Sequence, residues 1–323
     1  MEEQNHSALT GNRLIYLDSL RGFAILLVVV GHLIQYNYQS ALDDRIFNAI
    51  YSFHMPLFFF ISGASCSLSV HGINSVKGCV RDIWRKFSTL IIPSLSWGII
   101  MSFLNGEPLT SALYAHWFLY TLFVIFVLWY LKEFLIQFSR IFEIIFYVAI
   151  VLLFLLDIKR IPLMYLSVFC MGYYVQKYQI AKSYSWLCFL FFVLFVIGVP
   201  YFHYGDTTIG DPNRVWVQFP VSIVGSLGFY MIFYRLQLWY AKGLKILALI
   251  GSCTLGIYLV HFLFLQIKII EEIQTACCIP VQFILLMAIA SVISVVCIVV
   301  EKVIIVMPVA SLLFYGKRDN WEK

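Results

Sequence analysis

Long apolar segments separated by short polar connections run along almost the whole chain. An apolar segment of about 20 residues is long enough to cross a bilayer as an α-helix. The pattern predicts about ten such helices, at residues 14–38, 46–70, 87–105, 113–131, 141–156, 161–178, 185–203, 215–234, 246–268 and 279–300. Two of them, 141–156 and 161–178, are short for a crossing, so half-helices or tilted helices are the alternative there. The apolar segments do not alternate polar with apolar residues as the strands of a membrane β-barrel do. We therefore expect an all-α membrane protein, a polytopic bundle of transmembrane helices.

Composition agrees with this class. Hydrophobic residues make up 62% of the chain and charged residues 12%, about half the share of a typical soluble domain. The mean hydropathy is +0.88. No cleavage site follows the first apolar segment, which we interpret as a retained signal anchor. The eight cysteines follow the spacing of neither a zinc site nor a disulfide framework, and no metal site is predicted.

The distribution of positive charge predicts the orientation. With a cytoplasmic N-terminus, sixteen Lys and Arg fall on the cytoplasmic side, and five fall outside, namely Arg45, Lys159, Arg160, Arg214 and Lys268. This asymmetry predicts that both termini are cytoplasmic. It also accounts for the net charge of +5 without a nucleic-acid partner. The expected organisation is a cytoplasmic tail 1–12, a transmembrane domain 13–316 and a cytoplasmic tail 317–323, as a multi-pass protein of the cell (plasma or inner) membrane.

The first predicted helix carries the densest set of ionisable residues, and such groups are costly inside a membrane. Arg21 and His32 are separated by about 1,100° of helical rotation, so they share one face, with Ile25 and Val28 between them. Asp18 lies within roughly 60° of both, and His32 lies about 16 Å deeper than Arg21. This face predicts a path from the cytoplasmic surface to a buried imidazole. The structural alternative is an interfacial Asp18–Arg21 ion pair, with His32 hydrogen-bonded to a neighbouring helix.

Three further histidines are considered as candidates, namely His54, His116 and His261. His54 reaches mid-bilayer depth, either as part of a polar site or as the plug of a kink at Pro56. Residues 62–65 are small and suited to close helix packing. His116 and His261, the latter at the end of GSCTLGIYLVH, are interpreted as structural.

A short basic connection is expected after the second helix, with Lys77, Arg81, Arg85 and Lys86. Its charge fits a plain topology signal. It also fits an anion site, because Arg and Lys bind phosphate groups well. Such a site would lie on the cytoplasmic side, where phosphorylated cofactors are found.

Several separated motifs resemble the acyltransferase-3 family of integral membrane acyltransferases. RLIYLDSLRGFAILLVVVGH, from Arg13 to His32, is similar to the family's opening, and Arg21 and His32 match its motif of a basic residue, ten residues and a histidine. FHMPLFFFISG, WRKFSTLIIPSLSW, HWFL, LGIYLVH and the tail with FYGK are similar to later helices of the family. The third helix departs from the family pattern, because the R-x-x-R arrangement at its entry is absent around Arg85.

The resemblance implies transfer of an acyl group, usually acetyl, from cytoplasmic acetyl-CoA or another acyl-CoA to a hydroxyl of a cell-surface glycan or its lipid-linked precursor. On this hypothesis His32 is the general base, a role suited to a side chain that titrates near neutrality. Asp18 and Arg21 line the path from the cytoplasm and determine its charge. The phosphates of the donor are bound by Arg81, Arg85 and Lys86. His54 is a supporting polar group. The expected partners are the acyl-CoA, the carbohydrate acceptor and membrane lipids.

Alternatives stay open at this point. Double displacement through an acyl-histidine intermediate fits the same residues as direct transfer. A transporter or flippase for a glycan or lipid-linked intermediate would also place His, Asp and Arg inside a membrane. A purely structural role in an envelope assembly is a third reading, which gives the buried charges of the first helix no function.

Overall fold

The computed structural model describes residues 14–316, except 70–72, 74, 112–115, 157, 159, 205–211 and 268. Both expected tails lie outside the described residues. The described helices are α2 (Ile15–Asn37), α3 (Arg45–Ser69), α4 (Val76–Lys86), α5 (Ile92–Asn105), α7 (Trp117–Ile136), α8 (Ile141–Leu155), α9 (Arg160–Lys177), α10 (Ile180–Tyr184), α11 (Cys188–Gly198), α12 (Pro212–Ser252), α13 (Thr254–Val260), α14 (Ile269–Ala276), α15 (Ile279–Ile305) and α16 (Pro308–Tyr315). Short 3-10 turns and one π-helical turn connect some of them, and these ranges contain no strand.

The all-α membrane class predicted from the sequence is confirmed. Within the described ranges, seven helices are long and apolar enough to cross a membrane, and the bent pair formed by Thr254–Phe264 and Ile269–Ala276 brings the number to eight if it counts as one span. The helix α8 is apolar but shorter, as the sequence pattern indicated. The expected total of ten and the orientation of the termini stay predictions.

The region of α12 agrees in part with the sequence-based expectation of two spans at 215–234 and 246–268. The helix α12 runs from Pro212 to Ser252, but it consists of two helical segments that meet at a kink at Tyr240, where φ is −137° and ψ is 44°. The connection expected between the two spans is reduced to this kink, because the residues around it include Leu, Gln, Lys and Ala, which are good helix formers.

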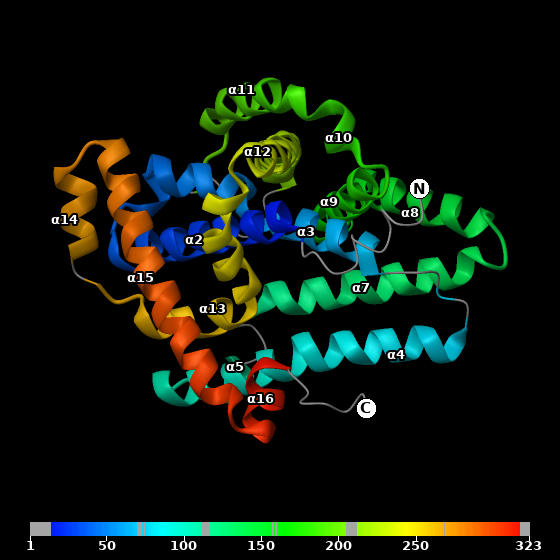
Figure 1. Cartoon of the computed structure of the whole chain (residues 1–323), viewed down its shortest axis with the longest axis horizontal. Helices are drawn as coiled ribbons and strands as arrows, with labels where there is room; N and C mark the ends of the chain where they lie inside the picture. Colours follow the sequence, from blue (N-terminus) through cyan, green and yellow to red (C-terminus); the bar gives the residue numbers. More distant parts are fainter. Residues whose placement is uncertain are drawn as a thin grey trace.

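The helix α2 forms the centre of the molecule. It packs mainly against α12 and also against α3 and α15, and Figure 1 shows α2 and α3 in the middle, with α7 and α4 side by side along one edge. Most residues between Tyr16 and Ile34 are buried. A helix that is buried over most of its surface is enclosed by other helices rather than facing lipid on one side. The polar residues of α2 are consequently held in a fixed protein environment.

Two helix crossings depend on glycine. A Cβ atom on Gly22 of α2 would lie 2.0 Å from the carbonyl oxygen of Leu247 in α12, and one on Gly63 of α3 would lie 1.9 Å from the carbonyl oxygen of Phe169 in α9. Real Cβ atoms do not come this close to a backbone oxygen. Glycine therefore lets the backbones touch, as in membrane helix pairs with small interfacial residues. The close packing expected from residues 62–65 is seen here.

The basic connection after α3 is not a loop. Its four cations lie on α4, whose first turn is capped by Ser75, the side chain of which accepts a hydrogen bond from the Gly78 N–H. The helix runs on through a π-helical turn, Phe87–Ile91, into α5. The loop expectation was wrong because a charge-rich segment with a good N-cap and no internal proline or glycine break after Gly78 forms a helix in its own right.

Candidate functional site

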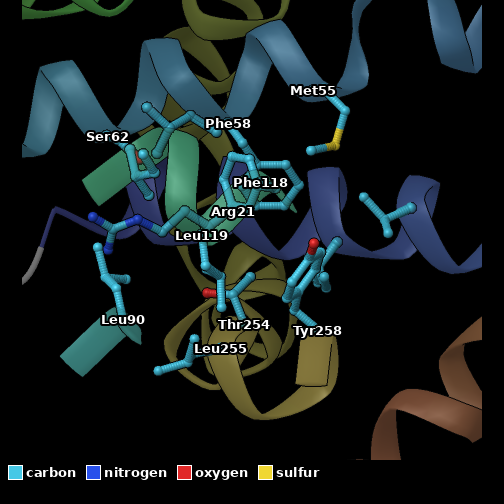
Figure 2. A pocket seen from close by; sticks show the side chains of 14 residues that line it. Arg21, Met55, Phe58, Ser62, Leu90, Phe118, Leu119, Thr254, Leu255 and Tyr258 are labelled. Atoms are coloured by element: carbon cyan, nitrogen blue, oxygen red, sulfur yellow. The ribbon is translucent and has the colours of Figure 1, made fainter. Parts of the chain in front are cut away.

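A cavity of about 140 Å³ lies between α2, α3, α7, α13 and the turn after α4. Its α2 wall consists of Arg21, Ile25 and Val28, which are successive members of the stripe identified in the sequence. The other lining residues are mostly apolar: Met55, Phe58, Ile61, Ser62, Leu90, Phe118, Leu119, Leu122, Thr254, Leu255 and Tyr258. Figure 2 shows Arg21 with Ser62 and Leu90 at one end of this group, and Met55 and Tyr258 toward the other. The cavity is thus apolar along its length and positively charged at one end.

The guanidinium of Arg21 is held in place at the charged end. Its Nη1 donates to Oδ1 of Asp18 at 2.7 Å, and its Nη2 donates to the hydroxyl of Ser65 on α3. The Arg21 side chain keeps 30% of its surface exposed. The Asp18–Arg21 ion pair, which the sequence analysis gave as part of the structural alternative, is therefore present, and it leaves part of the cation accessible at the cavity.

His32 pairs with another histidine. Its Nδ1 lies 2.9 Å from Nε2 of His261, and the second ring nitrogen of His261, Nδ1, lies 2.9 Å from the backbone carbonyl oxygen of Ile257. His261 is completely buried, whereas His32 is partly exposed. The pair joins α2 to the short turn His261–Phe264 that follows α13. His32 lies one helical turn beyond Val28, the last residue of α2 that lines the cavity.

Aromatic rings connect the cavity to the histidine pair. The ring centroid of Tyr258, a cavity residue, lies 6.1 Å from that of His261 and 5.8 Å from that of the buried His116. Phe262 packs against both His32 and His261, with centroids 4.9 and 4.3 Å away. The imidazoles are thus placed in a largely apolar environment at the uncharged end of the cavity.

His54 lies on α3, next to the cavity residue Met55. It is buried, and its Nδ1 donates to the carbonyl oxygen of Ile50 at 2.7 Å. Its ring contacts Tyr51, whose hydroxyl donates to Oε1 of Gln35 on α2 at 2.6 Å. His54 therefore belongs to the packing that holds α3 against the part of α2 that carries His32.

The three cations expected to contact the donor do not share one environment. Arg81 is exposed and its Nε lies 3.6 Å from Oδ1 of Asp82. Arg85 is also exposed. Lys86 instead faces α7, where its Nζ lies 3.9 Å from the centre of the Phe126 ring. Lys86 also lies about one helical turn before Leu90, which lines the cavity. Of the three cations, Lys86 is therefore the nearest along the chain to the charged end of the cavity.

The sequence analysis did not identify the contacts of His261 with His32 and Tyr258. His261 was assigned a structural role, because a single histidine at the end of an apolar segment gives no sign of its partner. The sequence indication was the spacing of Tyr258 and His261 in GIYLVH, which places both polar side chains on one face of a helix. Among the residues that the structure describes, no group of three or more His, Cys, Asp or Glu is arranged to hold a metal ion.

Comparison with known proteins adds a family assignment. A family model for the acyltransferase domain matches residues 14–300. The nodulation protein NolL of Mesorhizobium japonicum is 29% identical over 137 residues, covering 37% of this chain and 36% of that protein. The nodulation protein NolL of Sinorhizobium fredii is 32% identical over 146 residues, covering 40% of this chain and 39% of that protein. The matched part thus spans well under half the length of these relatives, and no solved structure matches the chain.

Proposed function

Because this chain belongs to the acyltransferase-3 family, we propose that it is a membrane O-acyltransferase. In this proposal it moves an acyl group, acetyl in the simplest case, from cytoplasmic acyl-CoA to a hydroxyl of a cell-surface glycan or a lipid-linked glycan precursor. The observation that carries the proposal is the continuous face of α2. Arg21, Ile25 and Val28 line a cavity, and His32 follows one turn later, paired with His261.

The cavity suits the acyl-carrying arm of the donor. Its walls are mainly apolar along the length between Arg21 and Tyr258, and binding pockets of this kind orient a ligand with a few polar groups. The accessible cation at Arg21 provides attraction for an anionic donor, and Lys86 and Arg85 extend the positive charge along α4 toward the phosphates. With the cytoplasmic N-terminus predicted from the charge distribution, the donor would enter from the cytoplasmic side.

His32 would act as the general base. As the acceptor's hydroxyl oxygen bonds to the thioester carbonyl carbon, its proton passes to His32. The carbon–sulfur bond then breaks, and the leaving sulfur takes this proton from His32, so that the products are an ester and free CoA. A positioned base contributes typically 10²–10⁴-fold to such a step. The partial exposure of His32, at the end of α2 away from Arg21, supports entry of the acceptor from the opposite side.

The proposal is tested with purified protein reconstituted into closed liposomes, given acetyl-CoA that carries a labelled acetyl group and an extract of surface glycans and lipid-linked precursors. We expect release of free thiol and label in the glycan fraction, in equal amounts and only when acceptor is present. His203→Gln is a matched control, because His203 is an exposed histidine outside the helices, and it should retain full activity. Movement of a glycan across the bilayer without thiol release would contradict the proposal and favour the transporter alternative.

A further inference from the structure

We propose that His261 is a positioning residue that fixes the tautomer of His32, so that Nε2 of His32 carries the free lone pair. The inference rests on the proposed function for its consequence, which is that Nε2 rather than Nδ1 takes the acceptor's proton. Two hydrogen bonds of His261 and the burial of its side chain support this assignment.

The first step concerns His261 and its own helix. A carbonyl oxygen only accepts hydrogen bonds, so the 2.9 Å contact between Nδ1 of His261 and the carbonyl oxygen of Ile257 requires a proton on Nδ1. In a neutral imidazole the other nitrogen is then an acceptor. Nε2 of His261 therefore presents a lone pair toward α2.

The second step concerns the charge of His261. The side chain is fully buried, and the rings of Phe262, Tyr258 and His116 lie around it. A charged imidazolium in such surroundings, with no carboxylate recorded beside it in the described part of the chain, carries a large desolvation cost. His261 is consequently the neutral Nδ1–H form, and Nε2 accepts.

The third step transfers this constraint to His32. Because Nε2 of His261 accepts, Nδ1 of His32 must be the donor across the 2.9 Å contact. The two ring planes differ by 14°, and the ring centroids are 5.2 Å apart. This is close to the largest centroid distance possible for two imidazoles whose nitrogens are 2.9 Å apart, because at that distance both nitrogens lie on the line between the centroids. The rings therefore meet edge to edge, with the N–H of His32 directed along the in-plane lone pair of His261.

The consequence is a defined proton acceptor. With its proton on Nδ1, neutral His32 has its lone pair on Nε2, and no hydrogen bond to Nε2 occurs among the described residues. The tautomer of a functional histidine is commonly set in this way by the partner of its other nitrogen. The chain Ile257–His261–His32 thus prepares one nitrogen for the acceptor without a charged partner.

A merely structural pair would also hold α2 against α13, so the test must separate the two roles. His261→Gln and His261→Asn are both polar and uncharged, but only the longer Gln carries an acceptor oxygen to the position of Nε2. We expect His261→Gln to keep the rate within about threefold of the original. His261→Asn should lower kcat by roughly 10- to 100-fold, the range found when a metal-bound histidine loses its hydrogen-bond partner, with the KM of donor and acceptor little changed. Equal rates in the two variants would overturn the proposal.

A second measurement does not depend on activity. In ¹⁵N-histidine-labelled protein, with the signals of His32 assigned by their loss in His32→Gln, solid-state NMR reports which nitrogen carries the proton. We expect the Nδ1–H form in the unsubstituted protein and a mixture of tautomers in His261→Asn. An Nε2–H form in the unsubstituted protein would overturn the inference even if the protein transfers acyl groups. The expected Nδ1–H form in a protein that transfers none would leave the inference standing and overturn the proposed function instead.

Discussion

Replacement of Arg21 by methionine tests the charged end of the cavity. The substitution removes the guanidinium that lines the cavity and leaves Asp18 without its 2.7 Å partner. A hydrogen bond to a charged group contributes about 1.5–3 kcal/mol, which corresponds to a factor of about 10–150 in binding. We therefore expect the KM for acyl-CoA to rise by about that factor, and the KM for the acceptor to stay close to its original value.

The substitution should also lower stability. The Asp18 side chain is only 11% exposed, and removing one partner of a buried pair leaves an uncompensated charge. Thermal unfolding in detergent should therefore occur at a lower temperature, and the KM values are measured on the folded protein. Arg140→Met is the matched control, since Arg140 is an exposed arginine at the start of α8 and should leave both KM values unchanged.

A second substitution separates charge from shape. In Arg21→Met the cavity end keeps the negative charge of Asp18, which repels an anionic donor. Adding Asp18→Asn removes this charge, so the double variant should recover part of the lost affinity for acyl-CoA. The assay is a steady-state measurement of thiol release at varied acyl-CoA. An unchanged KM in a well-folded Arg21→Met protein would refute the assignment of this cavity end to the donor.

Three further predictions concern the donor site, the packing and the topology. Lys86→Gln should raise the KM for acyl-CoA more than Arg81→Gln, because Lys86 faces the protein near the cavity, whereas Arg81 is exposed and ion-paired; equal effects would point to a diffuse topology signal. Gly63→Val should sharply reduce the yield and melting temperature of folded protein, because its Cβ would lie 1.9 Å from a backbone oxygen of α9; a normal melting curve would contradict this crossing. In a cysteine-free background, an impermeant thiol reagent should label Glu107→Cys in intact cells but Gln137→Cys only in broken cells, and the reverse pattern would invert the proposed orientation.

The sequence was most informative within single helices. The rotation and rise of an α-helix are constant, so the placement of Arg21, Ile25 and Val28 on one face of α2 follows from their spacing, and these three residues line the cavity. The Asp18–Arg21 ion pair follows from the same geometry. Small residues in α3 likewise indicated a close crossing, because only a missing side chain permits backbone contact in a membrane.

Relations between distant segments could not be obtained in this way. His32 and His261 are 229 positions apart, and their contact depends on how α13 packs against α2, which no local periodicity specifies. The charged stretches at Lys77–Lys86 and Arg235–Lys245 were interpreted as connections, because polarity is the usual sign of a loop in a membrane protein. Lys77–Lys86 is helical instead, and Arg235–Lys245 is helical on both sides of a kink at Tyr240, since polar residues with good helix propensity extend helices.

The most direct test of the account is the acyl-transfer rate of His32→Gln. Glutamine keeps hydrogen-bonding capacity at a similar size, but it cannot take up and release a proton near neutral pH. The measurement is transfer of labelled acetyl from acetyl-CoA to acceptor by equal amounts of folded protein, with His203→Gln beside it. If His32 is the general base, the rate falls by roughly 10²–10⁴-fold, while the melting temperature and His203→Gln stay near their original values. A His32→Gln protein that keeps more than about a tenth of the rate, well above the range expected for a lost base, would contradict the central claim and leave His32 with a structural role.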